Sequence, residues 1–135
     1  MKLLVDTSAL IALFLPDERN HQEAANFGRQ KPEPRFVLTE LILGELATRL
    51  RVRAGADRAV EVARDVLRSN RYELVFTDPE LLVGGLAKMA RFSDKRLSLT
   101  DCVSFELMEK LGLRAAFTFD RDFRDCGYRV MPPTP

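Results

Sequence analysis

The chain contains few of the residues from which many catalytic and structural sites are built. Its 135 residues include one histidine and two cysteines. A structural zinc site needs about four nitrogen or sulfur ligands, so no such site is expected. Cys102 and Cys126 cannot form a disulfide framework, and we expect them to be reduced thiols. A nucleophile–histidine apparatus would have to use His21, which lies in the polar stretch ERNHQE and is better explained as a helix-surface residue.

Long hydrophobic runs and a dominant charge are also missing. The longest early apolar run, Ala9 to Leu15, has seven residues, whereas a transmembrane helix needs ~20. The N-terminus is not a signal peptide by its pattern, because Asp6-Thr7-Ser8 interrupts the apolar region and no small-residue cleavage site follows. We therefore expect a cytoplasmic protein without a membrane partner. The net charge of +1 excludes a strongly basic coat for nucleic acid, although it allows a local basic patch.

What the sequence does contain is an alternation of short apolar runs and longer helical patterns. Strands are predicted over 2–5, 35–38, 72–76 and 114–118, with 128–131 as a fifth, edge strand. Helices are predicted over 7–15, 21–30, 39–53, 57–69, 77–92 and 99–111. This alternation indicates a mostly parallel sheet of four to five strands with helices on both faces. The length and the lack of linkers or repeats predict one domain over 1–135.

Acidic residues fall where such a sheet binds its ligands, beyond the carboxyl ends of the strands. Asp6 follows the first predicted strand, and Asp120 follows the fourth. Asp101 lies in the first turn of the helix over 99–111, and Glu45 lies in the middle of the helix over 39–53. If the first and fourth strands are neighbours, these side chains share one end of the sheet.

Each acid also has a purely structural interpretation. Asp6 can cap the next helix, the segment SLTD at 98–101 fits a capping box, Glu45 can pair with Arg49, and Asp120 can start a turn. If the four carboxylates gather about 6 Å apart, they repel by on the order of 3 kcal/mol per pair at an effective dielectric near 20. A divalent cation relieves this repulsion, and hard oxygen ligands suit Mg²⁺ or Mn²⁺.

The segments around these residues resemble the PIN-domain nucleases, and within them the small VapC-like ribonuclease toxins of type II toxin–antitoxin pairs. The matching segments are LLVDTSALIALF at 3–14, VLTELILGELATRL at 37–50, DKRLSLTDCVSFELMEKLGL at 94–113 and AFTFDRDF at 116–123. Their order, their spacing and the chain length also match, so the resemblance covers essentially the whole chain. It implies a three-layer α/β/α fold and a metal-dependent endoribonuclease.

The resemblance also implies a set of site residues. The four acids of the family fall on Asp6, Glu45, Asp101 and Asp120. Asp6 and Asp101 are the expected direct ligands of Mg²⁺ or Mn²⁺, while Glu45 and Asp120 bind through water or hold a second ion. The expected auxiliary residues are Thr7, Ser8, Thr118 and Asp122. The expected reaction is hydrolysis of an RNA phosphodiester by a metal-activated water, which leaves a 5′-phosphate and a 3′-hydroxyl.

An acidic site that binds RNA needs cations around it. The candidate contacts for RNA phosphates, or for an antitoxin, are Arg49, Arg53, Lys88, Arg91, Lys95 and Arg96. The same charges can instead simply solvate helix faces. The resemblance implies a small cognate antitoxin that blocks the acidic cleft. A homodimer is also expected, with its contact on the early apolar helix and the region from Asn20 to Phe27.

Other functions stay open at this point. The alternatives are a PIN-fold RNA-binding or interaction module without a toxin role, and a stand-alone RNA-processing nuclease. A haloacid-dehalogenase-type phosphatase would need D-x-D after the first strand, where Asp6-Thr7-Ser8 supplies one acid. A receiver domain would need an acidic pair there and a phosphorylatable aspartate after a middle strand. A P-loop is excluded because its glycine–lysine motif is absent.

Overall fold

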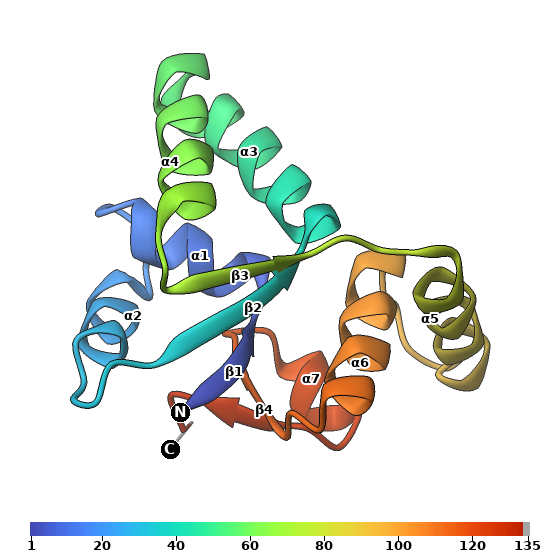
Figure 1. Ribbon diagram of the computed structural model, residues 1–135. Coiled ribbons are helices and arrows are strands. Elements are labelled where there is room, and N and C mark those ends of the chain that lie inside the picture. The colour runs from blue at the N-terminus through green and yellow to red at the C-terminus, as the bar shows by residue number, and fades with distance from the viewer. Residues whose placement is uncertain (134–135) are drawn as a thin grey trace.

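A five-stranded parallel sheet forms the centre of the protein (Figure 1). The structure is a computed structural model that describes residues 1–133. The strands are β1 (Lys2–Val5), β2 (Arg35–Thr39), β3 (Tyr72–Val75), β4 (Ala115–Phe117) and β5 (Arg129–Met131). Their order is β3-β2-β1-β4-β5, and every pairing among them is parallel. In this register Leu4 lies between Val37 and Ala116, so the first and fourth strands are neighbours, as the acidic cluster requires.

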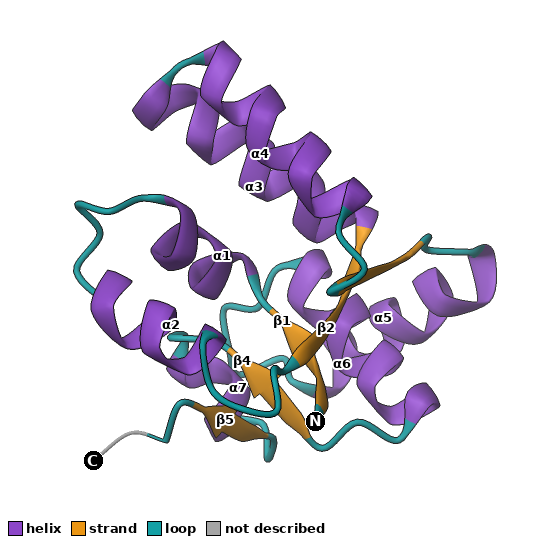
Figure 2. Ribbon diagram, turned by 60° about the vertical axis from the view of Figure 1, so that its left-hand side comes forward, coloured by secondary structure: helices purple, strands orange, loops and turns teal. Residues whose placement is uncertain are grey.

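Seven helices connect and cover the strands of the described residues. They are α1 (Thr7–Phe14), α2 (His21–Gly28), α3 (Glu40–Ala54), α4 (Ala56–Arg68), α5 (Pro79–Arg91), α6 (Leu99–Leu111) and α7 (Arg121–Asp125). Figure 2 shows helices on both sides of the sheet, which gives the three-layer α/β/α architecture expected from the sequence. It also shows the α3–α4 hairpin extending away from the sheet. The prediction missed α7, whose five residues are too short to show a helical period.

Alternate residues of the strands point into two separate cores. Leu3 and Val5 of β1 pack with apolar residues from α1 to α4. Leu4, between them, packs on the opposite face with residues of α5, α6 and α7, which include Leu81, Phe105 and Phe123 respectively. A strand buried on both faces explains why the sequence KLLV is almost entirely apolar.

Part of the region proposed for a homodimer contact is internal. Leu10 of α1 is fully buried, and Ala24 and Phe27 of α2 are 0% and 2% exposed, whereas Gln22 and Asn26 of α2 are exposed. The early apolar helix therefore covers the sheet of its own chain, and a contact of this region with a second copy stays a prediction. Among the described residues, no helix combines the length and apolar character needed to cross a membrane.

Two adjacent glycines let α5 and α6 come close together. A Cβ atom added at Gly84 would collide with the side chain of Glu106, at 2.4 Å from its nearest atom. A Cβ added at Gly85 would lie 2.5 Å from Val103 Cγ2 and 3.1 Å from the Val103 backbone. The α6 helix that carries Asp101 is thus held against a helix whose backbone leaves no room for a side chain at this point.

Gly85→Ala should therefore destabilise the protein by roughly 1–3 kcal/mol, the usual cost of overpacking a well-packed contact. Urea denaturation measures this change in the free energy of unfolding. Gly44→Ala is the matched control, because Gly44 is also helical and nothing lies within 4 Å of a Cβ there. That substitution should be neutral or stabilising by up to about 1 kcal/mol. If the two substitutions changed the free energy of unfolding equally, α5 and α6 would be able to move apart around the added methyl group without loss of stability.

Candidate active site

Three of the four predicted acids sit at the start of a helix, at the end of the sheet where the strands finish. Asp6 caps α1, with its Oδ2 accepting from Ser8 N at 3.4 Å. Asp120 caps α7, with its Oδ1 accepting from Asp122 N at 2.9 Å. Asp101 completes the capping box of α6, with its Oδ2 accepting from Ser98 N at 3.3 Å. The capping interpretations of Asp6 and Asp101 are therefore confirmed, whereas Asp120, expected to start a turn, caps the short helix α7. The positive ends of three helices favour the carboxylates.

Asp6 is the most enclosed member of the group, with 5% of its surface exposed. Its Oδ2 accepts hydrogen bonds from Ser8 Oγ at 2.8 Å and from Thr118 Oγ1 at 3.0 Å. Burial raises the pKa of Asp6, the hydroxyl hydrogen bonds oppose that rise, and the charge of Asp120 adds to it. Ser8 and Thr118 thus orient and partly stabilise a carboxylate that its surroundings otherwise disfavour.

Glu45 joins the site through Thr7. Thr7 Oγ1, in the first residue of α1, donates to Glu45 Oε1 at 2.9 Å across 38 residues of sequence. In residues 1–133 Glu45 forms no ion pair with Arg49, so the alternative of a solvated helical pair is not observed. The α3 helix starts at the carboxyl end of β2, where Thr39 Oγ1 accepts from Ile42 N, and this start brings Glu45 to the same end of the sheet.

The pKa of Asp101 is affected by burial and by the neighbouring acids. Its pKa is raised to about 7, first by burial and then by the negative charge of Asp6, with a smaller contribution from Asp120. Burial likewise raises the pKa of Asp122, and Asp120 and Asp125 add to this effect. The charges of Asp6 and Asp120 therefore reach Asp101, and the charge of Asp120 also reaches Asp6.

The chemistry of this group suits a hard divalent cation. All four side chains are carboxylates, and two of them have pKa values raised by enclosure and mutual repulsion. In the part of the chain that the structure describes, no three Asp, Glu, His or Cys side chains are arranged so that they hold a metal ion as they stand. Mg²⁺ usually keeps several waters and uses one or two carboxylates, so the donor set fits without a cage of three direct ligands.

The predicted basic residues have different environments. Lys88 is buried between α5 and α6, where its Nζ lies 3.0 Å from Glu106 Oε1 and 2.7 Å from Glu109 Oε2. This burial favours a packing role for Lys88 over contact with RNA. Lys95 pairs with Asp94 at 3.3 Å, and the Arg91 guanidinium lies 5.3 Å from the centre of the Phe92 ring. Arg96 is exposed before α6.

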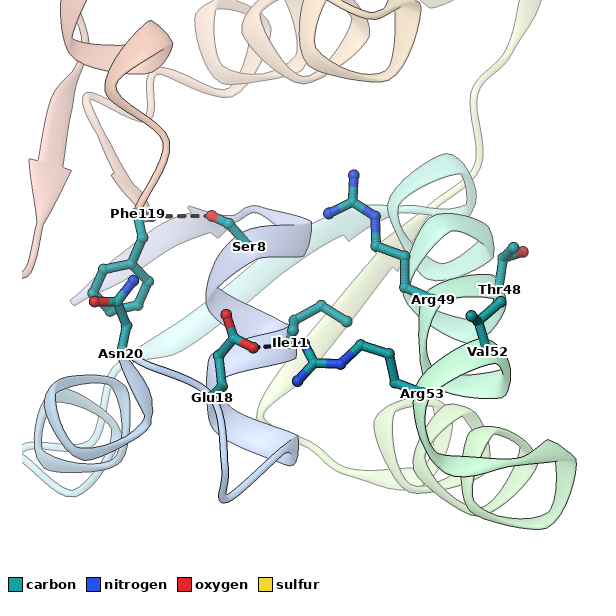
Figure 3. A pocket seen from close by; sticks show the side chains of 9 residues that line it. All are labelled: Ser8, Ile11, Glu18, Asn20, Thr48, Arg49, Val52, Arg53 and Phe119. Atoms are coloured by element: carbon teal, nitrogen blue, oxygen red, sulfur yellow. Dashed lines mark hydrogen bonds and ion pairs between the residues drawn. The ribbon is translucent and has the colours of Figure 1, made fainter.

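Arg49 and Arg53 lie together at a pocket beside the acids (Figure 3). The pocket has a volume of about 470 Å³. Arg53 is paired across it with Glu18 at 2.6 Å, whereas Arg49 is exposed and has no ion pair or hydrogen bond within residues 1–133. Six residues that line the pocket were not predicted as site residues or RNA contacts: Ile11, Glu18, Asn20, Thr48, Val52 and Phe119. Phe119 could have been found from the sequence, because it lies between Thr118 and Asp120, which were both predicted as site residues.

Comparison with known proteins identifies the family. The sequence profile of the PIN domain matches residues 3–127. The chain therefore belongs to the PIN-domain family, as its motifs predicted. It is 29% identical over 131 residues to the 23S rRNA-specific endonuclease VapC20 of Mycobacterium tuberculosis, which covers 97% of this chain and 98% of that protein. It is 24% identical over 119 residues to the ribonuclease VapC26 of the same organism, which covers 88% and 87% of the two chains.

Solved structures give the same result for the fold. The crystal structure of VapC20, described as a sarcin–ricin loop cleaving toxin, superposes with a TM-score of 0.86 at 28% identity and covers 93% of this chain and 95% of that chain. VapBC2 from Rickettsia felis superposes with a TM-score of 0.72 at 9% identity, covering 96% and 97%, and shows likeness of fold alone. The expected three-layer PIN fold is thereby confirmed.

The raised pKa of Asp101 predicts a specific pH dependence of stability. The folded state holds the Asp101 proton more tightly than the unfolded state, whose pKa is near 3.8. The resulting stabilisation is complete below about pH 4 and is lost as the pH rises through about 7. With a chelator present, the free energy of unfolding of the wild type should therefore decrease as the pH rises from about 4 to about 7. That of Asp101→Asn should decrease less over the same range.

Urea denaturation at several pH values measures this difference. Asp65→Asn is the control, because Asp65 is exposed on α4 away from the site, and its stability should follow that of the wild type. If Asp101→Asn runs parallel to the wild type at every pH, Asp101 does not carry the raised pKa.

Proposed function

We propose that this PIN-domain protein is a metal-dependent endoribonuclease and the toxin of a type II toxin–antitoxin pair. The observation that carries the proposal is the gathering of Asp6, Asp101 and Asp120 at one end of the sheet, with Glu45 joined to them through Thr7. The relatives named as endonuclease and ribonuclease support the reaction class. Several solved structures of similar fold are toxin–antitoxin complexes, which supports a small antitoxin as partner.

Asp6 and Asp101 would hold Mg²⁺ or Mn²⁺ directly, and Glu45 and Asp120 would hold it through water. When bound, the cation lowers the pKa of a water molecule and stabilises charge on the phosphoryl oxygens. Ser8 and Thr118 keep the Asp6 carboxylate oriented, and Thr7 does the same for Glu45. Asp122 adds negative charge beside Asp120.

Imidazole chemistry has no place in this site. The ring of His21 lies at the start of α2, with its Nδ1 2.7 Å from the carbonyl oxygen of Ala12. Attack by water on phosphorus, with departure of the 3′ oxygen, leaves a 5′-phosphate and a 3′-hydroxyl. We therefore infer these product ends, and we infer structured ribosomal RNA as the substrate class because of the 29% identical 23S rRNA-specific relative.

The helix α5 offers a second candidate surface for a homodimer. Exposed apolar side chains lie on this helix and just before it: Phe76, Leu82, Val83 and Leu86 are 71%, 37%, 64% and 49% exposed. These four residues are near one another in sequence and follow the edge strand β3.

Cleavage of a synthetic 23S rRNA hairpin and of total ribosomal RNA tests the ribonuclease function. We expect specific cleavage with Mg²⁺ or Mn²⁺ and none in EDTA. Asp6→Asn and Asp101→Asn should each reduce the rate by at least about 100-fold, because the contribution of a bound cation to such a reaction is several kcal/mol. A 5′-monophosphate-dependent exonuclease should degrade the downstream fragment.

Asp65→Asn is again the matched control and should cleave at the wild-type rate. Thermal unfolding in EDTA establishes that each variant is folded. Undiminished cleavage by either site variant, or by the wild type in chelator, would refute the proposed site. A downstream fragment with a 5′-hydroxyl end would refute the proposed direction of hydrolysis.

A further inference from the structure

The pocket beside the acids has no role in the hydrolysis proposed above. We propose that it binds one unpaired nucleobase of the RNA, stacked on Phe119, next to the phosphate that is cleaved. This inference rests on the proposed ribonuclease function and specifies its substrate as RNA with a nucleotide free to leave its helix.

One hydroxyl group belongs to both the pocket and the acidic site. Ser8 lines the pocket, and its Oγ donates to Asp6 Oδ2 at 2.8 Å and accepts from Phe119 N at 3.0 Å. Asp120 follows Phe119 in the chain, and its N donates to Thr118 Oγ1 at 2.9 Å. Phe119 is thus held between two residues of the acidic site, so a base on its ring is adjacent to a phosphate at the acids.

The pocket offers an aromatic surface with polar groups around it. Figure 3 shows Phe119 and Asn20 on one side and the two arginines of α3 on the other. Phe119 is half-buried and meets Phe117 edge-on, with ring centres 6.1 Å apart and planes at 64°. Single-stranded RNA is commonly recognised by stacking on such rings, with polar side chains reading the base edge. Asn20 supplies both a donor and an acceptor for that purpose.

The charges of the pocket leave one arginine for a phosphate. Arg53 engages two carboxylates, with Glu18 at 2.6 Å and Asp17 at 3.7 Å. Arg49 has no partner among residues 1–133 and comes from the turn of α3 that follows Glu45. Its guanidinium is available for a phosphate next to the bound base.

The size of the pocket limits what it can hold. A volume of about 470 Å³ is typical of a site for one small ligand. A base inside it cannot be paired at the same time, so the nucleotide has to come from a loop, a bulge or an extruded position. Selection by this pocket would therefore depend on RNA structure as well as on sequence.

A fluorescence titration tests the pocket without any cleavage. The chain has no tryptophan, so Phe119→Trp places a single indole at the proposed stacking position. In EDTA, at least one of the four ribonucleoside 5′-monophosphates should quench its fluorescence with a saturating curve below about 10 mM. Arg49→Gln in the same background should weaken that binding. Leu111→Trp is the control, because Leu111 is 44% exposed at the end of α6 and does not line the pocket, and its quenching should not saturate.

Three results would overturn the inference. They are the absence of saturable quenching with all four nucleotides, equal quenching of the Leu111→Trp control, and competition by inorganic phosphate as strong as that by the nucleotides. The last result would mean that the arginines bind an anion and that no base is held.

A cleavage experiment then places the base relative to the cut. In an RNA that the wild type cleaves, each nucleotide flanking the cut is replaced in turn by an abasic residue. One position should lower kcat/KM by roughly five- to 150-fold, the factor that corresponds to a stacking loss of 1–3 kcal/mol. Phe119→Leu should cause a similar loss on intact RNA and no further loss on the abasic RNA, while Phe119→Tyr should restore cleavage.

Additive losses from the abasic residue and Phe119→Leu would show that the base does not bind on this ring. Failure of the wild type to cleave any RNA with Mg²⁺ would instead refute the ribonuclease function, and the fluorescence result for the pocket would stand by itself. The two failures are therefore distinguishable.

Discussion

The central constraint on this structure is the repulsion between carboxylates that the fold places at one end of its sheet. The surrounding groups are arranged so that they offset this repulsion. Burial raises the pKa values of Asp6 and Asp101; the charge of Asp120 adds to the rise at both, and the charge of Asp6 adds to it at Asp101. Three helix N-termini and the hydroxyls of Ser8 and Thr118 offset part of this cost. The same helix N-termini and hydroxyl groups also fix the direction in which the carboxylate oxygens point.

This arrangement explains why structural and functional interpretations of these residues coincide. A cap residue satisfies backbone N–H groups with one carboxylate oxygen, and the other oxygen stays available for a ligand. The end of a parallel sheet supplies several helix starts at one place, so acids that serve as caps come together as a consequence of the topology. A binding site for a cation can thus be built from residues that each stabilise the fold.

The local features of the fold were readable from the sequence because they have local causes. Apolar runs such as KLLV reveal doubly buried strands, and the segments SLTD and TDPE mark helix starts. The contacts that depend on packing between distant elements were not readable. Lys88 resembles the exposed cations around it until α5 meets α6 and buries it beside Glu106. The partner of Glu45 is Thr7, 38 residues away, and not the neighbouring Arg49.

The same limit applies to the candidate pocket. Phe119 looks like one more core aromatic in the run AAFTFD. Its place before Asp120 hints at the site, and the hydrogen bond from its N–H to Ser8 shows that it borders the acids. Asn20 and Glu18 belong to the connection between α1 and α2, which has no pattern that predicts its position. The acids could be found from their place after strands, whereas the pocket emerges only when three separate segments meet.

The strand order has a consequence for when the site comes into being. β1, made first, occupies the middle of the sheet and pairs with β4, which ends at Phe117. In a chain synthesised from its N-terminus, Asp6 is present long before Thr118 and Asp120, the residues that surround it in the fold. The acidic cluster is therefore incomplete until β4 and the residues that follow it have been synthesised and have paired with β1.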